Sequence, residues 1–209
     1  MPVDRVAYVV DDEATVRRSL ALLLRSDGFS VRDFDGGDAF LRAAAALPFG
    51  CVLLDLRMPG MDGLAVQREM AARGLKLPVV VVTAHGDIAL AVQAMKAGAC
   101  DFIEKPYDDE VILHAAEAAL ARGDEERARV RDAEEAGARI AALTPRETEV
   151  LRGLVAGRSN KVIAFDLGVS PRTVELHRAN MMAKLGVRSL SEAVRIALSA
   201  GFGSGRDRG

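Results

Sequence analysis

The chain has 209 residues, half of them hydrophobic and none of them tryptophan, and its formal net charge is −2 at pH 7. This length allows one large domain or two small ones with mostly aliphatic cores. No signal peptide opens the chain and no apolar segment approaches the ~20 residues that span a bilayer, so we expect a cytoplasmic protein without a membrane partner. Cys51 and Cys100 lie in apolar contexts outside any metal-ligand spacing, which predicts buried free thiols.

The first 121 residues alternate between short apolar runs and amphipathic segments. Expected strands span residues 5–10, 29–34, 51–54, 78–83 and 100–104. Expected helices span residues 14–26, about 37–47, 63–73, 87–97 and a segment from Asp108 onward. Five strands alternating with five helices predict an α/β domain with a doubly wound parallel sheet and right-handed crossovers.

Polar residues follow the carboxyl ends of these strands. Asp11 and Asp12 come after the first strand, Asp55 after the third, Thr83 after the fourth and Lys105 after the fifth. In a doubly wound sheet these ends meet at one edge, so we expect the five side chains to converge there. Three facing carboxylates repel one another unless a cation intervenes, which favours Mg²⁺, or Mn²⁺ in its place, held by oxygen ligands.

A carboxylate in such a pocket can act as a nucleophile and form an aspartyl-phosphate. We predict that Asp55 is the phosphoacceptor, and that Lys105 and the Thr83 hydroxyl neutralise the charge that develops on the phosphoryl group. Lys105 is also expected to pair with Asp55 before phosphorylation. The alternative is a buried Asp–Lys ion pair at the sheet edge with no chemical role.

The composition changes after residue 121. Residues 122–142 are alanine-rich and of mixed charge, which predicts a solvated helical linker, with a dimerising coiled coil as the alternative. Residues 143–202 show four short helices, the first of them opened by a capping box of Thr144 and Glu147. The second and third, from about Lys161 and over 171–185, flank a glycine turn as in a helix-turn-helix, and the last begins near Ser191. Residues 203–209 have no apolar side chain and are expected to be disordered.

The charge is distributed unevenly along the chain. Residues 1–121 carry 12 Lys and Arg against 18 Asp and Glu, whereas residues 143–209 carry 11 against 6. The basic second part suggests nucleic acid as its partner. In helix 171–185, one stripe is expected to face inward: Val174, His177 or Arg178, Met181 and Leu185. The opposite side contains Arg172, Glu175, Leu176, Ala179 and Ala183, and its small central residues permit close approach to DNA.

Residues 1–121 closely resemble the receiver domain of two-component response regulators. The resemblance is carried by Val9–Glu13, Leu53–Gly63, Val81–Ala84 and Asp101–Pro106. It implies a flavodoxin-like sheet of strand order 2-1-3-4-5 and phosphorylation of Asp55 by a sensor histidine kinase. It also implies Mg²⁺ held directly by Asp12, Asp55 and the backbone carbonyl of Arg57, with Asp11 acting through water.

The same resemblance gives Thr83 and Phe102 the part of a switch that responds to the phosphoryl group. Phe102 can alternatively be read as a core residue of its strand. Arg57 and His85 flank the site and are candidates for setting the lifetime of the phosphoryl group, although a loop histidine is usually only solvated.

Residues 143–200 resemble the LuxR-type DNA-binding domain. The motifs are Leu143–Glu147, Gly157–Ala164, Ser170–His177 and Lys184–Val187. In this family Glu147 supports the fold, and the groove-facing positions correspond to Glu175, Leu176 and Ala179. Glu175 replaces the basic residue often found there, and it either accepts from a cytosine amino group or discourages wrong sequences. The predicted DNA-contacting set is Lys161, Ser170, Arg172, Thr173, Glu175, Leu176, His177, Arg178, Ala179 and Lys184.

The order of receiver, linker and LuxR-type domain is most similar to the FixJ subgroup of response regulators. We therefore predict a transcription regulator that dimerises on phosphorylation, binds double-stranded promoter DNA and contacts RNA polymerase. We expect no turnover enzyme, only slow self-dephosphorylation. Two alternatives are a phosphotransferase or phosphatase with an aspartyl-phosphate intermediate, and a regulator that binds DNA without phosphorylation.

Overall fold

The computed structural model describes residues 5–84 and 87–202. The chain divides into two compact units, Met1–Glu125 and Glu126–Gly209. Two sequence predictions concern residues outside the described ranges. They are the disorder of the tail 203–209 and the effect of His85 on the lifetime of the phosphoryl group. Among the residues that are described, no helix is both long and apolar enough to cross a membrane.

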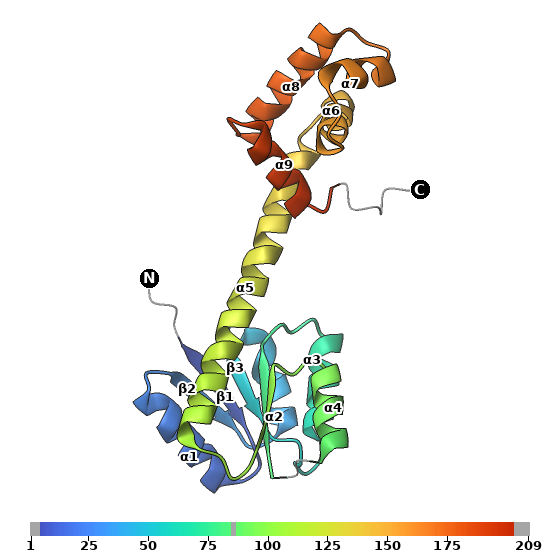
Figure 1. Cartoon of the computed structure of the whole chain (residues 1–209). Helices are drawn as coiled ribbons and strands as arrows, with labels where there is room; N and C mark the ends of the chain where they lie inside the picture. The colour runs from blue at the N-terminus through green and yellow to red at the C-terminus, as the bar shows by residue number, and fades with distance from the viewer. Residues whose placement is uncertain (1–4, 85–86, 203–209) are drawn as a thin grey trace. The chain divides into compact units, whose positions relative to one another are not determined.

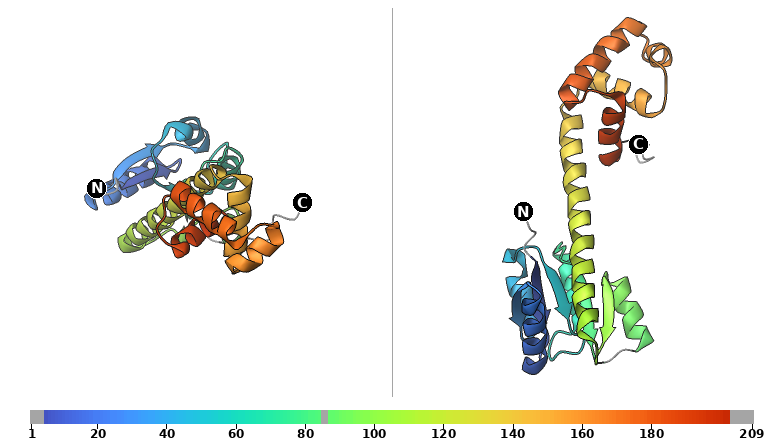
Figure 2. Two further views of the ribbon diagram at one scale, coloured as in Figure 1. Left: turned by 90° about the horizontal axis from the view of Figure 1, so that it is seen from above. Right: turned by 60° about the vertical axis from the view of Figure 1, so that its left-hand side comes forward.

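The first unit is a five-stranded sheet with helices on both faces (Figures 1 and 2). The strands are β1 (Val6–Val10), β2 (Ser30–Phe34), β3 (Cys51–Leu54), β4 (Val79–Thr83) and β5 (Asp101–Glu104). The helices are α1 (Ala14–Ser26), α2 (Gly37–Ala43), which a 3-10 turn (Ala44–Ala46) extends, α3 (Gly63–Ala72), α4 (Ile88–Lys96) and α5 (Asp109–Ala141). All neighbouring strands are parallel in the order β2-β1-β3-β4-β5, which confirms the predicted fold class.

Alternation along the strands builds one apolar layer on each face of the sheet. Val9 and Leu53 pack with residues of α1 and α5, whereas Val10 and Leu54 pack with residues of α2, α3 and α4. Strand β3 is therefore buried at every position. This explains its continuous apolar sequence, because a strand covered on both faces has no solvent side.

The strand register fixes what lies at the carboxyl edge. Val10 is paired with Leu54, so Asp11 and Asp55 leave the ends of two adjacent strands, and the Asp55 amide donates to the Val10 carbonyl at 2.9 Å. On the other side, the Lys105 amide donates to the Thr83 carbonyl at 2.9 Å. The order of connections reverses between β1 and β3, and that reversal creates the crevice in which ligands of doubly wound sheets bind.

Helix α5 is continuous from Asp109 to Ala141, so the predicted linker 122–142 is the second part of this helix. The boundary between the two units falls inside it, after Glu125. Gly123 lies where α5 passes Phe49. A Cβ atom at position 123 would lie 2.7 Å from Phe49 Cζ and 3.1 Å from Pro78 Cγ, so the glycine permits a close approach that any side chain would obstruct.

The second unit adds four helices to the end of α5: α6 (Pro145–Val155), α7 (Asn160–Leu167), α8 (Pro171–Leu185) and α9 (Leu190–Ser199). Their shared core contains Leu151, Ile163, Val174, Met181 and Leu185. Helices α7 and α8 are joined by the short segment Gly168–Ser170, as the helix-turn-helix pattern predicts. The last helix begins at Leu190, next to Ser191 as predicted, and Ser189 caps it.

A buried carboxylate holds the start of α6. Glu147 is 3% exposed and completes the predicted capping box, in which its Oε2 accepts from the Thr144 amide at 2.8 Å. The same oxygen accepts from Lys184 Nζ at 2.8 Å. The hydrogen bond from Lys184, followed by that from the Thr144 amide, holds the pKa of the Glu147 carboxyl below its usual range.

Glu147→Gln is expected to destabilise the second unit by about 1–2 kcal/mol at pH 7, because it weakens a charge-assisted hydrogen bond. A lowered pKa means that the ionised carboxylate favours the folded state above the ordinary glutamate pKa, and that this gain is lost as the pH falls through the folded-state pKa. Thermal unfolding should therefore separate the variant from the wild type at pH 7, and the difference should shrink as the pH falls through the folded-state pKa of Glu147. Glu149→Gln is the control, since Glu149 pairs with Arg146 at the surface of the unit; equal losses in the two variants would contradict the assignment.

Candidate functional site

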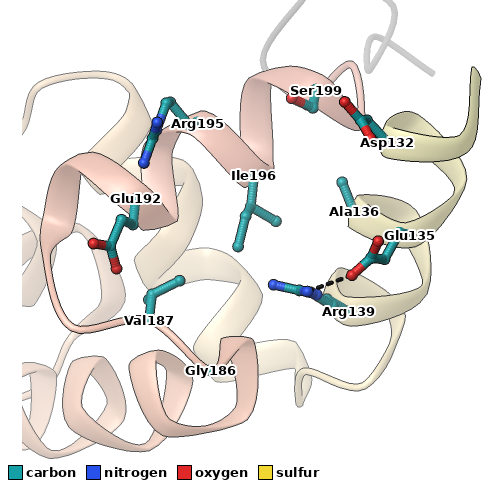
Figure 3. Close-up of a pocket in the computed structure, with 10 residues that line it drawn as sticks. All are labelled: Asp132, Glu135, Ala136, Arg139, Gly186, Val187, Glu192, Arg195, Ile196 and Ser199. Atoms are coloured by element: carbon teal, nitrogen blue, oxygen red, sulfur yellow. Dashed lines mark hydrogen bonds and ion pairs between the residues drawn. The ribbon is translucent and has the colours of Figure 1, made fainter. Parts of the chain in front are cut away.

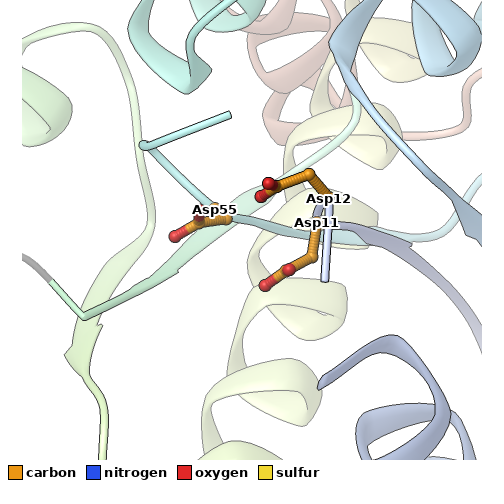
Figure 4. A group of neighbouring side chains, drawn as sticks. All are labelled: Asp11, Asp12 and Asp55. Atoms are coloured by element: carbon orange, nitrogen blue, oxygen red, sulfur yellow. The ribbon is translucent and has the colours of Figure 1, made fainter. Parts of the chain in front are cut away.

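Three carboxylates converge at the carboxyl edge of the sheet (Figure 4). Asp11, Asp12 and Asp55 each place a carboxylate oxygen within 4.8 Å of the others. Asp11 and Asp55 are only 2% and 6% exposed, whereas Asp12 is open to solvent. The convergence that the sequence predicts is therefore present. The pocket is open to solvent on the side of Asp12, where a cation can enter. Oxygen donors of this kind suit Mg²⁺.

Lys105 reaches the pocket, but its nearest partner differs from the predicted one. Its Nζ lies 2.6 Å from Asp11 Oδ2 and 3.9 Å from Asp55 Oδ1. The ammonium group is thus hydrogen-bonded to Asp11 and only electrostatically paired with Asp55. This arrangement leaves the Asp55 oxygens less obstructed than a direct Lys105–Asp55 hydrogen bond would.

The surroundings of Asp55 shift the pKa of its carboxyl in opposite directions. Burial raises the pKa of the Asp55 carboxyl, and the nearby Asp11 carboxylate raises it further; the Lys105 charge and a hydrogen bond from Thr83 lower it. The Arg57 amide also donates to Asp55 Oδ2 at 3.2 Å. The net shift is upward because desolvation dominates. Binding a cation or a phosphoryl group would relieve this unfavourable charge.

Asp62 and Gly63 shape the connection between Asp55 and α3. Asp62 caps α3 by accepting from the Ala65 amide at 2.7 Å. Gly63 begins the helix directly against the site, where an added Cβ would lie 2.3 Å from the Asp55 carbonyl oxygen. Only glycine allows α3 to start this close to the reactive strand end.

The two predicted switch residues occupy different environments. Thr83 is fully buried at the end of β4, and its side chain hydrogen-bonds to Asp55. Phe102 on β5 is half-buried and packs against the apolar layer on the α2–α4 face. Thr83 is thus in contact with the predicted phosphoacceptor, and Phe102 lies on the outer strand beyond it.

Two residues near the pocket were not found by the sequence patterns. Arg17 on α1 donates from Nη1 to the carbonyls of both Asp11 and Asp12. Tyr107 is half-buried, and its burial, with the Asp11 and Asp109 carboxylates nearby, raises the pKa of its hydroxyl. Neither belongs to a recognisable spacing, since a single arginine in a helix and a tyrosine after a proline are common in any protein.

In the second unit, α8 separates its inward and outward residues as predicted. Val174, Met181 and Leu185 are buried, while His177 and Arg178 are half-buried beside them. The outward face is exposed and contains Arg172, Glu175, Leu176, Ala179 and Ala183. Leu176 is 60% exposed, which is unusual for leucine and leaves an apolar contact available.

The other predicted DNA-contacting residues are arranged around the start of this helix. Ser170 caps α8 by accepting from the Thr173 amide at 3.1 Å, and the two hydroxyls are 2.8 Å apart. Lys161 is exposed in the first turn of α7. Lys184 differs from them, because its ammonium group is bound to the Glu147 carboxylate.

A cavity of about 430 Å³ lies in the second unit, between the last turns of α5 and helix α9 (Figure 3). Its charged lining residues are Asp132, Glu135, Arg139, Glu192 and Arg195. Arg139 is paired with Glu135 and also donates to the Leu185 carbonyl at 3.5 Å. The guanidinium therefore meets the negative end of the α8 dipole and links the end of α5 to α8.

Comparison with known families covers most of the chain. Residues 7–117 match the family described as "Response regulator receiver domain". Residues 141–197 match the family described as "Bacterial regulatory proteins, luxR family". The two matches coincide with the sheet unit and with the helical unit respectively.

Individual proteins resemble the chain over nearly its full length. The transcriptional regulatory protein FixJ of Azorhizobium caulinodans is 49% identical over 207 residues, which are 99% of this chain and 98% of that protein. Among solved structures, full-length FixJ from B. japonicum has 46% identity and a TM-score of 0.61, covering 95% of this chain and 98% of that chain. The response regulator StyR has 41% identity and a TM-score of 0.79, covering 94% of this chain and 99% of that chain.

Proposed function

The chain belongs to the response regulators, as a FixJ-like two-component transcription regulator with a receiver domain and a LuxR-type DNA-binding domain; from this we propose that phosphorylation of Asp55 by a histidine kinase is its input. The observation that carries the proposal is the pocket itself. Asp55 lies at the end of β3 with Asp11 and Asp12 beside it, and with Lys105 and Thr83 in contact range.

The donor set fits a divalent cation such as Mg²⁺ or Mn²⁺. We propose that Asp12, Asp55 and the Arg57 carbonyl hold it directly and that Asp11 holds it through water. All are hard oxygen donors, and none is a thiolate or imidazole that would favour a softer metal. The cation supplies positive charge that neutralises the transferring phosphoryl oxygens.

The residues of the chain then have distinct parts in the transfer. An Asp55 oxygen forms a bond to phosphorus as the bond from phosphorus to the kinase imidazole nitrogen breaks, and the imidazole keeps the electron pair. Lys105 places a positive charge beside the same oxygens, and the Thr83 hydroxyl can donate to the phosphoryl group. Attack of water on phosphorus would later release inorganic phosphate and return the free Asp55 carboxylate, which is the slow self-dephosphorylation that we propose.

The first unit also has an apolar surface suited to pairing two chains. Helix α4 exposes Ile88, Val92 and Met95, and α5, which follows β5, exposes Val111. We propose that the movement of Thr83 and Phe102 after phosphorylation changes this surface and favours dimerisation. Exposed apolar side chains grouped in this way commonly mark an interaction site.

Val92→Glu is expected to weaken the phosphorylated dimer by roughly tenfold or more, about 1.4 kcal/mol, because it introduces a charge into an apolar contact. Sedimentation velocity of acetyl phosphate-treated protein measures the effect. Leu22→Glu is the matched control, since Leu22 is an exposed apolar residue of α1 on the other face of the sheet. A dimer that survives Val92→Glu but not Leu22→Glu would place the pairing surface on α1.

The output of the chain is proposed to be DNA binding by α8. Glu175 is placed to accept from a cytosine amino group and Leu176 to contact a thymine methyl, while Ala179 lets the helix approach the groove. Lys161, Ser170, Arg172, Thr173 and Arg178 are proposed to contact phosphates, with His177 beside them. Two paired units bind a two-fold site more tightly than one, and a promoter-bound dimer can then contact RNA polymerase.

The test compares DNA binding with and without phosphorylation. Duplexes are selected from a randomised library by the full-length chain in Mg²⁺, once with acetyl phosphate and once without. The proposal expects a two-fold symmetric site and a much higher affinity after phosphorylation. Tight binding that is indifferent to acetyl phosphate would instead identify a regulator that works without this input.

A further inference from the structure

Arg17 contacts the backbone on which the acidic residues stand. Its Nη1 donates to the Asp11 carbonyl at 2.7 Å and to the Asp12 carbonyl at 2.8 Å. The side chain is 14% exposed and comes from the fourth residue of α1. One guanidinium nitrogen therefore fixes two successive peptide groups between β1 and α1.

A second contact anchors the other side of this guanidinium. Arg17 Nε lies 3.4 Å from Asp33 Oδ2 of β2, although the buried Nε–H is not aligned for a hydrogen bond. The attraction is therefore mainly between the charges. Asp33 keeps Arg17 directed across the end of β1, so the clamp on Asp11 and Asp12 rests on a neighbouring strand.

The Asp11 carboxylate is held by two other groups. Asp11 Oδ1 accepts from the Glu13 amide at 2.8 Å, and Asp11 Oδ2 accepts from Lys105 Nζ at 2.6 Å. Lys105 thus acts on the side chain, and Arg17 acts on the main chain. Without Arg17, the loop would be free to relax away from Asp55 and reduce the repulsion among three carboxylates.

We propose that Arg17 is a positioning residue of the acidic pocket, which holds Asp11 and Asp12 toward Asp55 and thereby sets the affinity for a divalent cation. The inference rests on the proposed function, because the cation is the one that assists phosphorylation of Asp55. Arginine is suited to this task because Nη1 donates to both carbonyls while the Nε side of the same planar group stays beside Asp33. A lysine ammonium is a compact charge on a flexible stem and cannot occupy both positions at once.

The test measures Mg²⁺ binding directly, by titration calorimetry on full-length Arg17→Met, Arg17→Lys and Arg18→Met. Arg18 is the matched control because it is the exposed neighbour on the same helix. Residues that orient metal ligands typically change affinity 10–100-fold, so Arg17→Met should weaken Mg²⁺ binding by roughly tenfold, with Arg17→Lys intermediate. Arg18→Met should bind as the wild type does.

A second readout separates positioning from general damage. The rate of phosphorylation by acetyl phosphate is measured across Mg²⁺ concentrations, with circular dichroism to verify folding. Arg17→Met should need more Mg²⁺ for half-maximal rate and recover most of the rate at saturation. Wild-type affinity in both Arg17 variants would overturn the inference alone, and so would a loss of rate that saturating Mg²⁺ does not restore. A wild-type chain that bound no Mg²⁺ would overturn the proposed function as well. If Arg17→Met does not fold, Arg17→Lys alone decides the question.

Discussion

Asp55→Asn is expected to abolish phosphorylation of the chain. Asparagine keeps the shape of the side chain but has no anionic oxygen to attack phosphorus, so no aspartyl-phosphate forms. The gain in DNA affinity that accompanies pairing, on the order of 100-fold or more, should disappear with it. Incorporation of labelled phosphate from acetyl phosphate, and binding of the selected duplex before and after treatment, measure the two losses.

Asp62→Asn is the control for this substitution. Asp62 follows in the same turn but caps α3 rather than facing the acidic pocket, and asparagine is also a good N-cap. This variant should be phosphorylated as readily as the wild type. Label that persisted in Asp55→Asn would show that another carboxylate accepts the phosphoryl group.

Asp55→Asn should also stabilise the fold when no metal is bound. Burial raises the pKa of the Asp55 carboxyl, which means that the ionised group favours the unfolded state at neutral pH. Asparagine removes that charge and its repulsion with Asp11. A higher melting temperature for Asp55→Asn in chelator-treated buffer would indicate a residue kept for its chemistry at a cost in stability.

Ala179→Glu is expected to weaken binding to the selected duplex by at least roughly 100-fold, about 2.8 kcal/mol. Ala179 is exposed on the outward face of α8, where a small side chain permits close approach to the groove. Glutamate adds both bulk and a negative charge that faces the phosphates. Fluorescence anisotropy with the phosphorylated chain measures the change.

Ala138→Glu provides the matched control for the added charge. Ala138 is an exposed alanine of α5 within the same unit. Its substitution changes the net charge equally but lies outside the proposed contact helix, so affinity should change little. Equal losses in the two variants would show that net charge, rather than contact by α8, explains the effect.

The sheet and the convergence at its edge could be predicted from the sequence because both depend on order along the chain. An apolar run such as Cys51–Leu54 has one stable environment, a strand covered on both faces. Once the strands are parallel, the residues that follow them must meet at one edge. Asp11, Asp55 and Thr83 were therefore placed correctly without any knowledge of their distances.

What the sequence did not reveal depends on side-chain geometry. The preference of Lys105 for Asp11 over Asp55 is a difference of little more than 1 Å between two plausible partners. Arg17 reads as an ordinary charged helix residue, because its targets are backbone carbonyls that carry no sequence signal. The continuity of α5 through Gly123 likewise depends on packing, since glycine disfavours helices and the contact with Phe49 that favours glycine here is distant in sequence.

The ion pair between Lys184 and Glu147 has a consequence for how DNA binding responds to ionic strength. Each lysine or arginine that neutralises a phosphate releases condensed counterions, and the salt dependence of affinity counts those residues, with a slope of about −0.9 for each. Lys184 already neutralises a carboxylate of its own chain, so it adds nothing to that count. Its charge holds the carboxyl end of α8 in place. The slope therefore counts only those lysine and arginine side chains that are not paired with a carboxylate of the protein.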